Sequence, residues 1–172
     1  TPKNARFIFN EDTKQLDLFE AAIIGRALDI PATIQSINTL APQGQHQIPL
    51  AFQEMLPAVT DDMTSEQLGV TELVSAQRTT FAGSSAERIQ NIKAASKNFL
   101  GLLVAPGGQF SMVEYMDDVS LDNGYAEALI IFGGRTIKGV GGGVCQVSTT
   151  LFRAVVFGGY QIDERYSHAY RV

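Results

Sequence analysis

Cys145 is the residue with the clearest potential for covalent chemistry, because a cysteine thiolate is a strong nucleophile and the chain has one cysteine. It follows residues 139–143, of which four are glycines that permit positive φ angles and close approach of another molecule. A helix is predicted directly after this run, so we expect Cys145 in or just before the first turn. The partial positive charge and free N–H groups at a helix N-terminus favour a thiolate and can hold an oxyanion.

A cysteine nucleophile also needs a base, which is usually a histidine. His168 follows Cys145 by 23 residues (168 − 145), on a final extended segment, residues 160–172. Glu164 and Arg165 precede this histidine, and either could orient the imidazole or bind a substrate carboxylate. In a regular strand Glu164 and His168 share a face, whereas Arg165 points to the other face.

Other interpretations of these residues are simpler. A lone cysteine is more often a small buried hydrophobe than a nucleophile, and glycine runs commonly build tight turns. A phosphate-binding loop is excluded because no Gly-Lys-Ser/Thr follows the glycines. Ser148, Thr149 and Thr150 are expected to form first-turn hydrogen bonds rather than act as nucleophiles. Arg88 and Lys93 are expected on a solvated helix face.

Composition excludes several classes of protein. The 172 residues are 45% apolar and 18% charged, which suits one globular domain or two small ones. A net charge of −5 argues against nucleic-acid binding, and no polybasic run would hold the chain on an anionic membrane. One cysteine and two distant histidines, His46 and His168, do not fit zinc spacings, so we expect no metal and no cofactor.

Prolines concentrate in residues 1–57 and glycines in residues 101–159. This difference in composition predicts two structural units, which together must position the residues named above. In the first unit, residues 5–10 and 15–19 predict a hairpin. Further predictions there are a helix that starts at Asp29 and ends by Gly44, an edge strand over residues 47–55, a capping box at residues 64–67 with a short helix ended by Gly69, and a strand over residues 71–81.

The second unit opens with a capping box at residues 84–87 and a helix whose buried stripe includes Ile89 and Ile92. Residues 128–132 and 135–138 flank two glycines and predict a β-hairpin. Residues 146–157 carry apolar side chains at helical spacing. The fold class is therefore α+β, with helices packed on mainly antiparallel sheets in both units.

The second unit resembles the VanW family. The residues that carry the resemblance are 80–81, 88–95, 106–111, 124–125, 141–151 and 164–168, and the element Gly-Gly-Gly-x-Cys-Gln-x-Ser-Thr-Thr-Leu is the most specific of them. The resemblance assigns residues 79–172 to a VanW-like domain, truncated at its C-terminus. Residues 1–78 are similar, more loosely, to the peptidoglycan-binding α/β domain that often precedes it.

The resemblance implies a bacterial envelope protein related to glycopeptide resistance, acting as an L,D-transpeptidase that forms 3-3 cross-links between peptidoglycan stem peptides. The implied catalytic residues are Cys145, His168 and Glu164, and the implied substrate-binding residues are Arg165, Gly141, Gly142, Gly143, Gln146, Ser148 and Thr149. Neither a cofactor nor a nucleic acid takes part. The expected location is the extracellular face of the envelope, with an N-terminal membrane anchor missing from this chain.

Two other functions stay open from the sequence. One is a non-catalytic module that binds peptidoglycan or a partner through the glycine loop, or serves as an accessory to glycopeptide resistance. The other is a cysteine peptidase or amidase that uses water as the acceptor. Loss of 3-3 cross-linking in Cys145→Ala would separate catalysis from binding alone.

Overall fold

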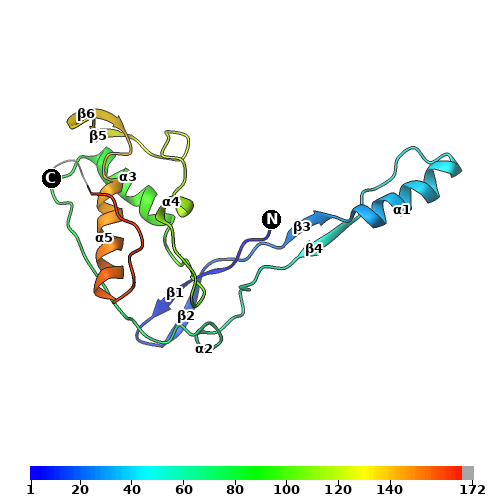
Figure 1. The fold of residues 1–172 in the computed structure, drawn as a ribbon, viewed down its shortest axis with the longest axis horizontal. Coiled ribbons are helices and arrows are strands. Elements are labelled where there is room, and N and C mark those ends of the chain that lie inside the picture. Colours follow the sequence, from blue (N-terminus) through cyan, green and yellow to red (C-terminus); the bar gives the residue numbers. More distant parts are fainter. Residues whose placement is uncertain (168–172) are drawn as a thin grey trace. The chain divides into compact units, whose positions relative to one another are not determined.

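A computed structural model describes residues 1–167 of the chain. The chain forms two compact units, Thr1–Thr71 and Glu72–Val172, which are described separately (Figure 1). Each strand in the described residues belongs to a two-stranded antiparallel sheet, and the helices are short to medium in length. The α+β fold class predicted from the sequence is confirmed.

The first unit begins with the predicted hairpin, formed by β1 (Arg6–Asn10) and β2 (Gln15–Glu20). Its turn is stabilised by Asn10, whose Oδ1 accepts from the backbone N–H groups of Asp12 and Thr13 at 3.1 and 3.2 Å. A side chain that bonds to the backbone two and three residues ahead fixes a turn locally. Ala5 and Phe7 are the buried apolar residues of this region.

A second sheet in this unit pairs β3 (Gly25–Leu28) with β4 (Phe52–Met55). Between them lie α1 (Ile30–Leu40), capped by Asp29, and the 3₁₀ turn η1 (Ala41–Gln43), which ends at Gly44. The predicted strand over residues 47–55 is shorter than expected, because only its last four residues pair. The predicted capping box is present and opens α2 (Ser65–Leu68).

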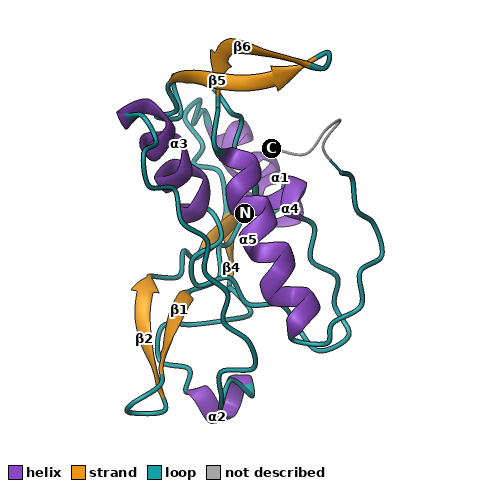
Figure 2. Ribbon diagram, turned by 90° about the vertical axis from the view of Figure 1, so that its left-hand side faces the viewer, coloured by secondary structure: helices purple, strands orange, loops and turns teal. Residues whose placement is uncertain are grey.

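The second unit contains two longer helices, α3 (Ala86–Lys97) and α5 (Val144–Phe157), which contact each other (Figure 2). A hairpin of β5 (Glu127–Phe132) and β6 (Arg135–Val140) lies at the end of the unit where both helices begin. The short helix α4 (Met112–Tyr115) was not predicted. The buried apolar residues are Ile92, Ala95, Tyr125 and Ala128, so the core lies between α3 and the start of β5.

The strand predicted over residues 71–81 is wrong, because this segment pairs with no strand. Its polar groups are bonded elsewhere: the Thr80 carbonyl accepts from the Gln146 side chain at 2.9 Å. The segment after α5 also contains no strand in its described part, residues 160–167. Neither of these described segments takes part in a β-ladder.

Candidate functional site

Cys145 is the second residue of α5, as the sequence predicts, and its free thiol is exposed. Gly143 forms the N-cap at φ +115°, a left-handed conformation that side-chain-bearing residues rarely adopt. The helix has 14 residues, so its N-terminus carries the full partial positive charge of an aligned set of peptide dipoles. A thiol in this position is accessible to an electrophile.

Two backbone N–H groups beside the thiol have no acceptor within residues 1–167. The Val144 N–H donates to the Gly141 carbonyl at 3.1 Å, and the Gln146 N–H donates to the Gly143 carbonyl at 3.0 Å. The N–H groups of Gly143 and Cys145 have no such partner. The Cys145 N–H belongs to the cysteine itself and the Gly143 N–H lies two residues before it, and free backbone N–H groups of this kind can donate hydrogen bonds to an oxygen that carries negative charge.

The glycine loop packs closely against the protein itself. A Cβ on Gly142 would lie 2.9 Å from the Ala128 Cβ and still closer to the Leu129 carbonyl oxygen. A Cβ on Gly143 would lie 3.0 Å from the Arg88 Cγ. These glycines are therefore required for β5 and α3 to approach the loop, and contact of residues 141–143 with a substrate stays a prediction.

A buried carboxamide joins three elements beneath the loop. Asn91, in α3, is fully buried and donates from Nδ2 to the carbonyls of Ala126, at 3.0 Å, and Gly142, at 2.9 Å. Its Oδ1 accepts from the Ala126 N–H at 2.7 Å. The sequence interpretation gave this residue no role, although a polar side chain adjoining the buried stripe of Ile92 and Ala95 was visible in the pattern.

A second polar network fixes the first turn of α5. Gln146 accepts at Oε1 from the Arg88 guanidinium at 2.8 Å, and its Nε2 donates to the Thr79 hydroxyl at 3.1 Å and to the Thr80 carbonyl. Thr79 also pairs with the Thr150 hydroxyl at 2.7 Å. The prediction that Arg88 lies on a solvated face is wrong, because it is half-buried and bonded to Gln146 and Ser84.

This network uses both polar atoms of the Gln146 carboxamide within the protein. Its predicted contact with a substrate stays a prediction, and its observed bonds connect α5 to α3 and to residues 79–80. On the neighbouring face of the same turn, Ser148 is half-buried and Thr149 is exposed. At helical spacing these two residues lie on the face that carries Cys145.

The segment after α5 turns back toward the N-terminal end of the helix (Figures 1 and 2). The Arg165 guanidinium carbon lies 4.9 Å from the centroid of the Phe152 ring. Phe152 follows Cys145 by seven residues, or two helical turns, so both side chains lie on one face of α5. Farther back, Asp163 accepts from the Gln109 side chain at 3.3 Å, which connects the segment to the loop after α3.

In the described structure, the Glu164 side chain forms a hydrogen bond with a residue of its own segment. Its carboxylate accepts from the hydroxyl of Tyr166, and this bond raises the pKa of that phenol above its ordinary value. Within the described part of the chain, no hydrogen bond or ion pair joins Glu164 to Cys145. His168 lies outside the described residues, so the predicted proximity of Cys145, Glu164 and His168 stays a prediction.

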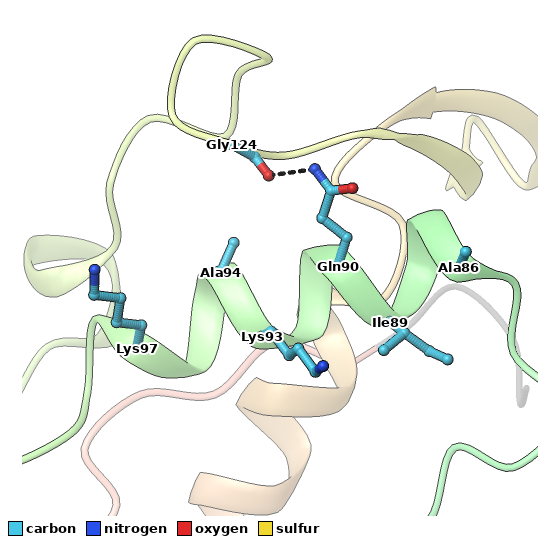
Figure 3. Close-up of a pocket in the computed structure, with 7 residues that line it drawn as sticks. All are labelled: Ala86, Ile89, Gln90, Lys93, Ala94, Lys97 and Gly124. Carbon is cyan, nitrogen blue, oxygen red and sulfur yellow. Dashed lines mark hydrogen bonds between the residues drawn. The ribbon is translucent and has the colours of Figure 1, made fainter.

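Two hollows lie beside different faces of α3. A groove of about 460 Å³ runs between α3, α5 and residues 77–81, with Gln146 and Thr79 at its polar end and Phe99 and Leu151 on its walls. The other, of about 440 Å³, lies between α3 and Gly124 and contains Lys93 and Lys97 (Figure 3). Of the predicted site residues that the structure describes, Gln146 alone lines either hollow.

Residues 87–172, which run from the second residue of α3 through the β5–β6 hairpin and α5, match the protein family described as VanW like protein. The chain belongs to the VanW-like family. The family match begins in α3 and therefore covers Asn91, the glycine loop and Cys145. No solved structure matches the chain.

Two curated relatives support this family assignment. The uncharacterized protein YoaR of Bacillus subtilis is 36% identical over 130 residues, which are 73% of this chain and 41% of YoaR. The vancomycin B-type resistance protein VanW of Enterococcus faecalis is 32% identical over 81 residues, which are 47% of this chain and 30% of that protein. The VanW-like chain thus spans less than half the length of either relative.

Within residues 1–167 of this VanW-like protein, no three His, Cys, Asp or Glu side chains are close enough together to hold a metal ion. The helices of the same described region include none that is both long enough and apolar enough to cross a membrane.

Proposed function

We propose that this VanW-like protein is a cysteine-dependent acyltransferase that acts on peptidoglycan stem peptides, as an L,D-transpeptidase that forms 3-3 cross-links. The observation that carries the proposal is the exposed Cys145 thiol beside the unpaired N–H groups of Gly143 and Cys145. A nucleophile adjacent to two free backbone donors is the arrangement that acyl transfer needs, because the donors stabilise the oxyanion of the tetrahedral intermediate.

The first half of the reaction forms an acyl-enzyme. The Cys145 thiolate attacks the amide carbonyl carbon between the third residue of a stem tetrapeptide and D-Ala. The carbon–sulfur bond forms, the carbonyl oxygen takes the negative charge at the N–H groups of Gly143 and Cys145, and the carbon–nitrogen bond then breaks. D-Ala leaves as the free amine after its nitrogen takes a proton, a transfer that we assign to the imidazole of His168.

The second half transfers the acyl group to another stem. The side-chain amine of a second stem attacks the thioester carbonyl, a carbon–nitrogen bond forms, and the carbon–sulfur bond breaks. The thiolate of Cys145 is regenerated and the proton of the amine passes to the imidazole. One amide bond replaces another, so the exchange requires no ATP.

Substrate recognition is assigned to the face of α5 that carries the cysteine. Arg165 lies over Phe152 on this face and forms no ion pair with a described acidic residue. A guanidinium held by an aromatic ring can still bind a carboxylate through its N–H fork. We assign it to a carboxylate of the stem peptide, about 10 Å along the helix from the reacting carbonyl. Ser148 and Thr149 lie between the two positions.

The cellular setting proposed is the outer face of the bacterial envelope, where stem peptides are found. The relative named for vancomycin B-type resistance supports a role in the cell wall. The first unit is proposed as the module that holds the wall polymer. Its residues 30–53 contain no Asp, Glu, Lys or Arg, and the apolar side chains of Ile30, Ile34 and Phe52 are exposed there, which suits an uncharged ligand.

That exposed surface also supports a second candidate function, wall binding without catalysis. Incubation of the chain with a disaccharide tetrapeptide separates the two. We expect mass spectrometry to show release of D-Ala, an adduct of the acyl group on Cys145 and dimers with a 3-3 linkage. Cys145→Ala should abolish all three, whereas Arg153→Ala, an exposed substitution elsewhere on α5, should leave them unchanged. Cross-linking by Cys145→Ala at the wild-type rate would overturn the catalytic proposal.

A further inference from the structure

The fully buried Asn91 carboxamide is the polar centre of the second unit. It lies on α3, and all three of its hydrogen bonds go to the backbone of Ala126 or Gly142. The Ala126 carbonyl also accepts from the Gly141 N–H at 3.2 Å. One side chain thus joins the middle of α3, the residue that precedes β5, and the loop that ends two residues before the cysteine.

We infer that Asn91 is a positioning residue for the reaction at Cys145, an inference that rests on the proposed function. The Gly142 carbonyl bonded to Asn91 belongs to the peptide unit whose nitrogen is the Gly143 N–H. The plane of that peptide is therefore fixed by the Asn91 bond, because a peptide unit is rigid. The orientation of this plane also sets the direction of the Gly143 N–H, which is one of the two donors assigned to the oxyanion.

Close packing alone does not fix this orientation. Gly143 is at φ +115°, and glycine has a broad range of accessible backbone angles. Rotation of the 142–143 peptide would change the direction of the Gly143 N–H, and the Asn91 bond to the Gly142 carbonyl opposes this rotation. The second Nδ2 bond and the Oδ1 bond, both to Ala126, hold the carboxamide itself in place.

Aspartate is nearly the same shape as asparagine but can supply none of the Nδ2 donations. Asn91→Asp retains an acceptor for the Ala126 N–H and places a carboxylate oxygen against the carbonyls of Ala126 and Gly142. It therefore releases the 142–143 peptide while α3 keeps its length and its apolar contacts. A second variant, Asn91→Ser, is uncharged and can donate to one carbonyl at most.

The test compares both variants with Phe99→Leu, a packing change on the C-terminal side of α3, at matched folded fractions. We expect kcat for acyl transfer to fall about 100-fold in Asn91→Asp, the loss typical of a misplacement of about 1 Å, with KM changed less than about twofold. Hydrogen exchange should rise at residues 142–145 and stay unchanged at residues 89–97. Phe99→Leu should change neither kcat nor the exchange of residues 142–145.

Wild-type kcat and unchanged exchange at residues 142–145 in a folded Asn91→Asp or Asn91→Ser variant would overturn the inference. Equal kcat losses in Asn91→Ser and Phe99→Leu would overturn it as well, since they would indicate general destabilisation. A failure of the proposed function would be recognised by a different result, namely acyl transfer that persists in Cys145→Ala. In that case the exchange measurement still decides whether Asn91 orders the loop.

Discussion

The guanidinium of Arg165 stacks on the ring of Phe152, two helical turns from Cys145 on the same face of α5. This contact and the Gln109–Asp163 hydrogen bond are two interactions that hold residues 161–167 near the rest of the second unit. The Arg165–Phe152 pair therefore connects the cysteine-bearing helix with the segment that leads to His168.

Loss of this pair should loosen the segment without unfolding the unit. A cation–π contact at an exposed site contributes about 0.5–1 kcal/mol, so Phe152→Ala should change the free energy of unfolding through this contact by no more than that. Limited proteolysis should cut residues 161–167 faster in Phe152→Ala than in the wild type, while Phe152→Tyr should behave like the wild type. Equal cleavage rates in all three proteins would contradict the assignment.

Gln146→Ala should destabilise the second unit more than a neighbouring surface change. The substitution leaves the half-buried Arg88 guanidinium and the Thr79 hydroxyl without one partner each, and such a loss costs about 2 kcal/mol. Urea denaturation should show this difference in the free energy of unfolding. Thr149→Ala, an exposed change in the same region of α5, should stay within about 0.5 kcal/mol of the wild type.

Gly142→Ala should be among the most damaging single-methyl substitutions in the chain. The added Cβ would meet the Leu129 carbonyl and the Ala128 side chain, and overpacking of this kind costs about 3 kcal/mol. Gly107→Ala is a suitable comparison, because its Cβ would meet no atom within 4 Å and its φ of +74° costs only about 1–2 kcal/mol. Thermal melts that rank Gly107→Ala as the less stable variant would refute this prediction.

Stability should fall at alkaline pH partly through Tyr125. Burial raises the pKa of this phenol, and the nearby Asp117 carboxylate raises it further. The folded state therefore holds the phenolic proton more tightly than the unfolded state, where the pKa is about 10. The stabilisation is complete below pH 10 and is lost as the pH rises through the folded-state pKa. Urea midpoints between pH 8.5 and 11 should fall less steeply in Tyr125→Phe.

Local chemistry explains why several elements could be predicted from the sequence. The β1–β2 turn is closed by Asn10, and α2 is opened by Thr64 and Gln67, which bond to each other's backbone N–H groups. Each device lies within a few residues of the element that it defines. The start of α5 is equally local, since the glycine run ends where the helix begins.

The errors arise where the decisive contact is distant in the sequence. Residues 71–81 have the composition of a strand, but Thr79 and Thr80 bond to Gln146 on a helix far along the chain. Arg88 has the spacing of a surface cation, and its burial depends on that same partner. The apolar pattern places Asn91 beside the buried stripe of α3 but does not show its partners, because Ala126 and Gly142 lie far along the chain.

The exposure of Cys145 has a practical consequence. Since the chain contains one cysteine and its sulfur is accessible, a maleimide dye or an acrylamide warhead would modify a single, known position. Ser148 and Thr149, one turn along the same side of α5, would then be the nearest helical neighbours of the attached group, with Phe152 one turn farther. The rates at which electrophiles of different shape modify this sulfur would therefore measure the accessibility of the surrounding surface, and no cysteine would have to be introduced by mutation.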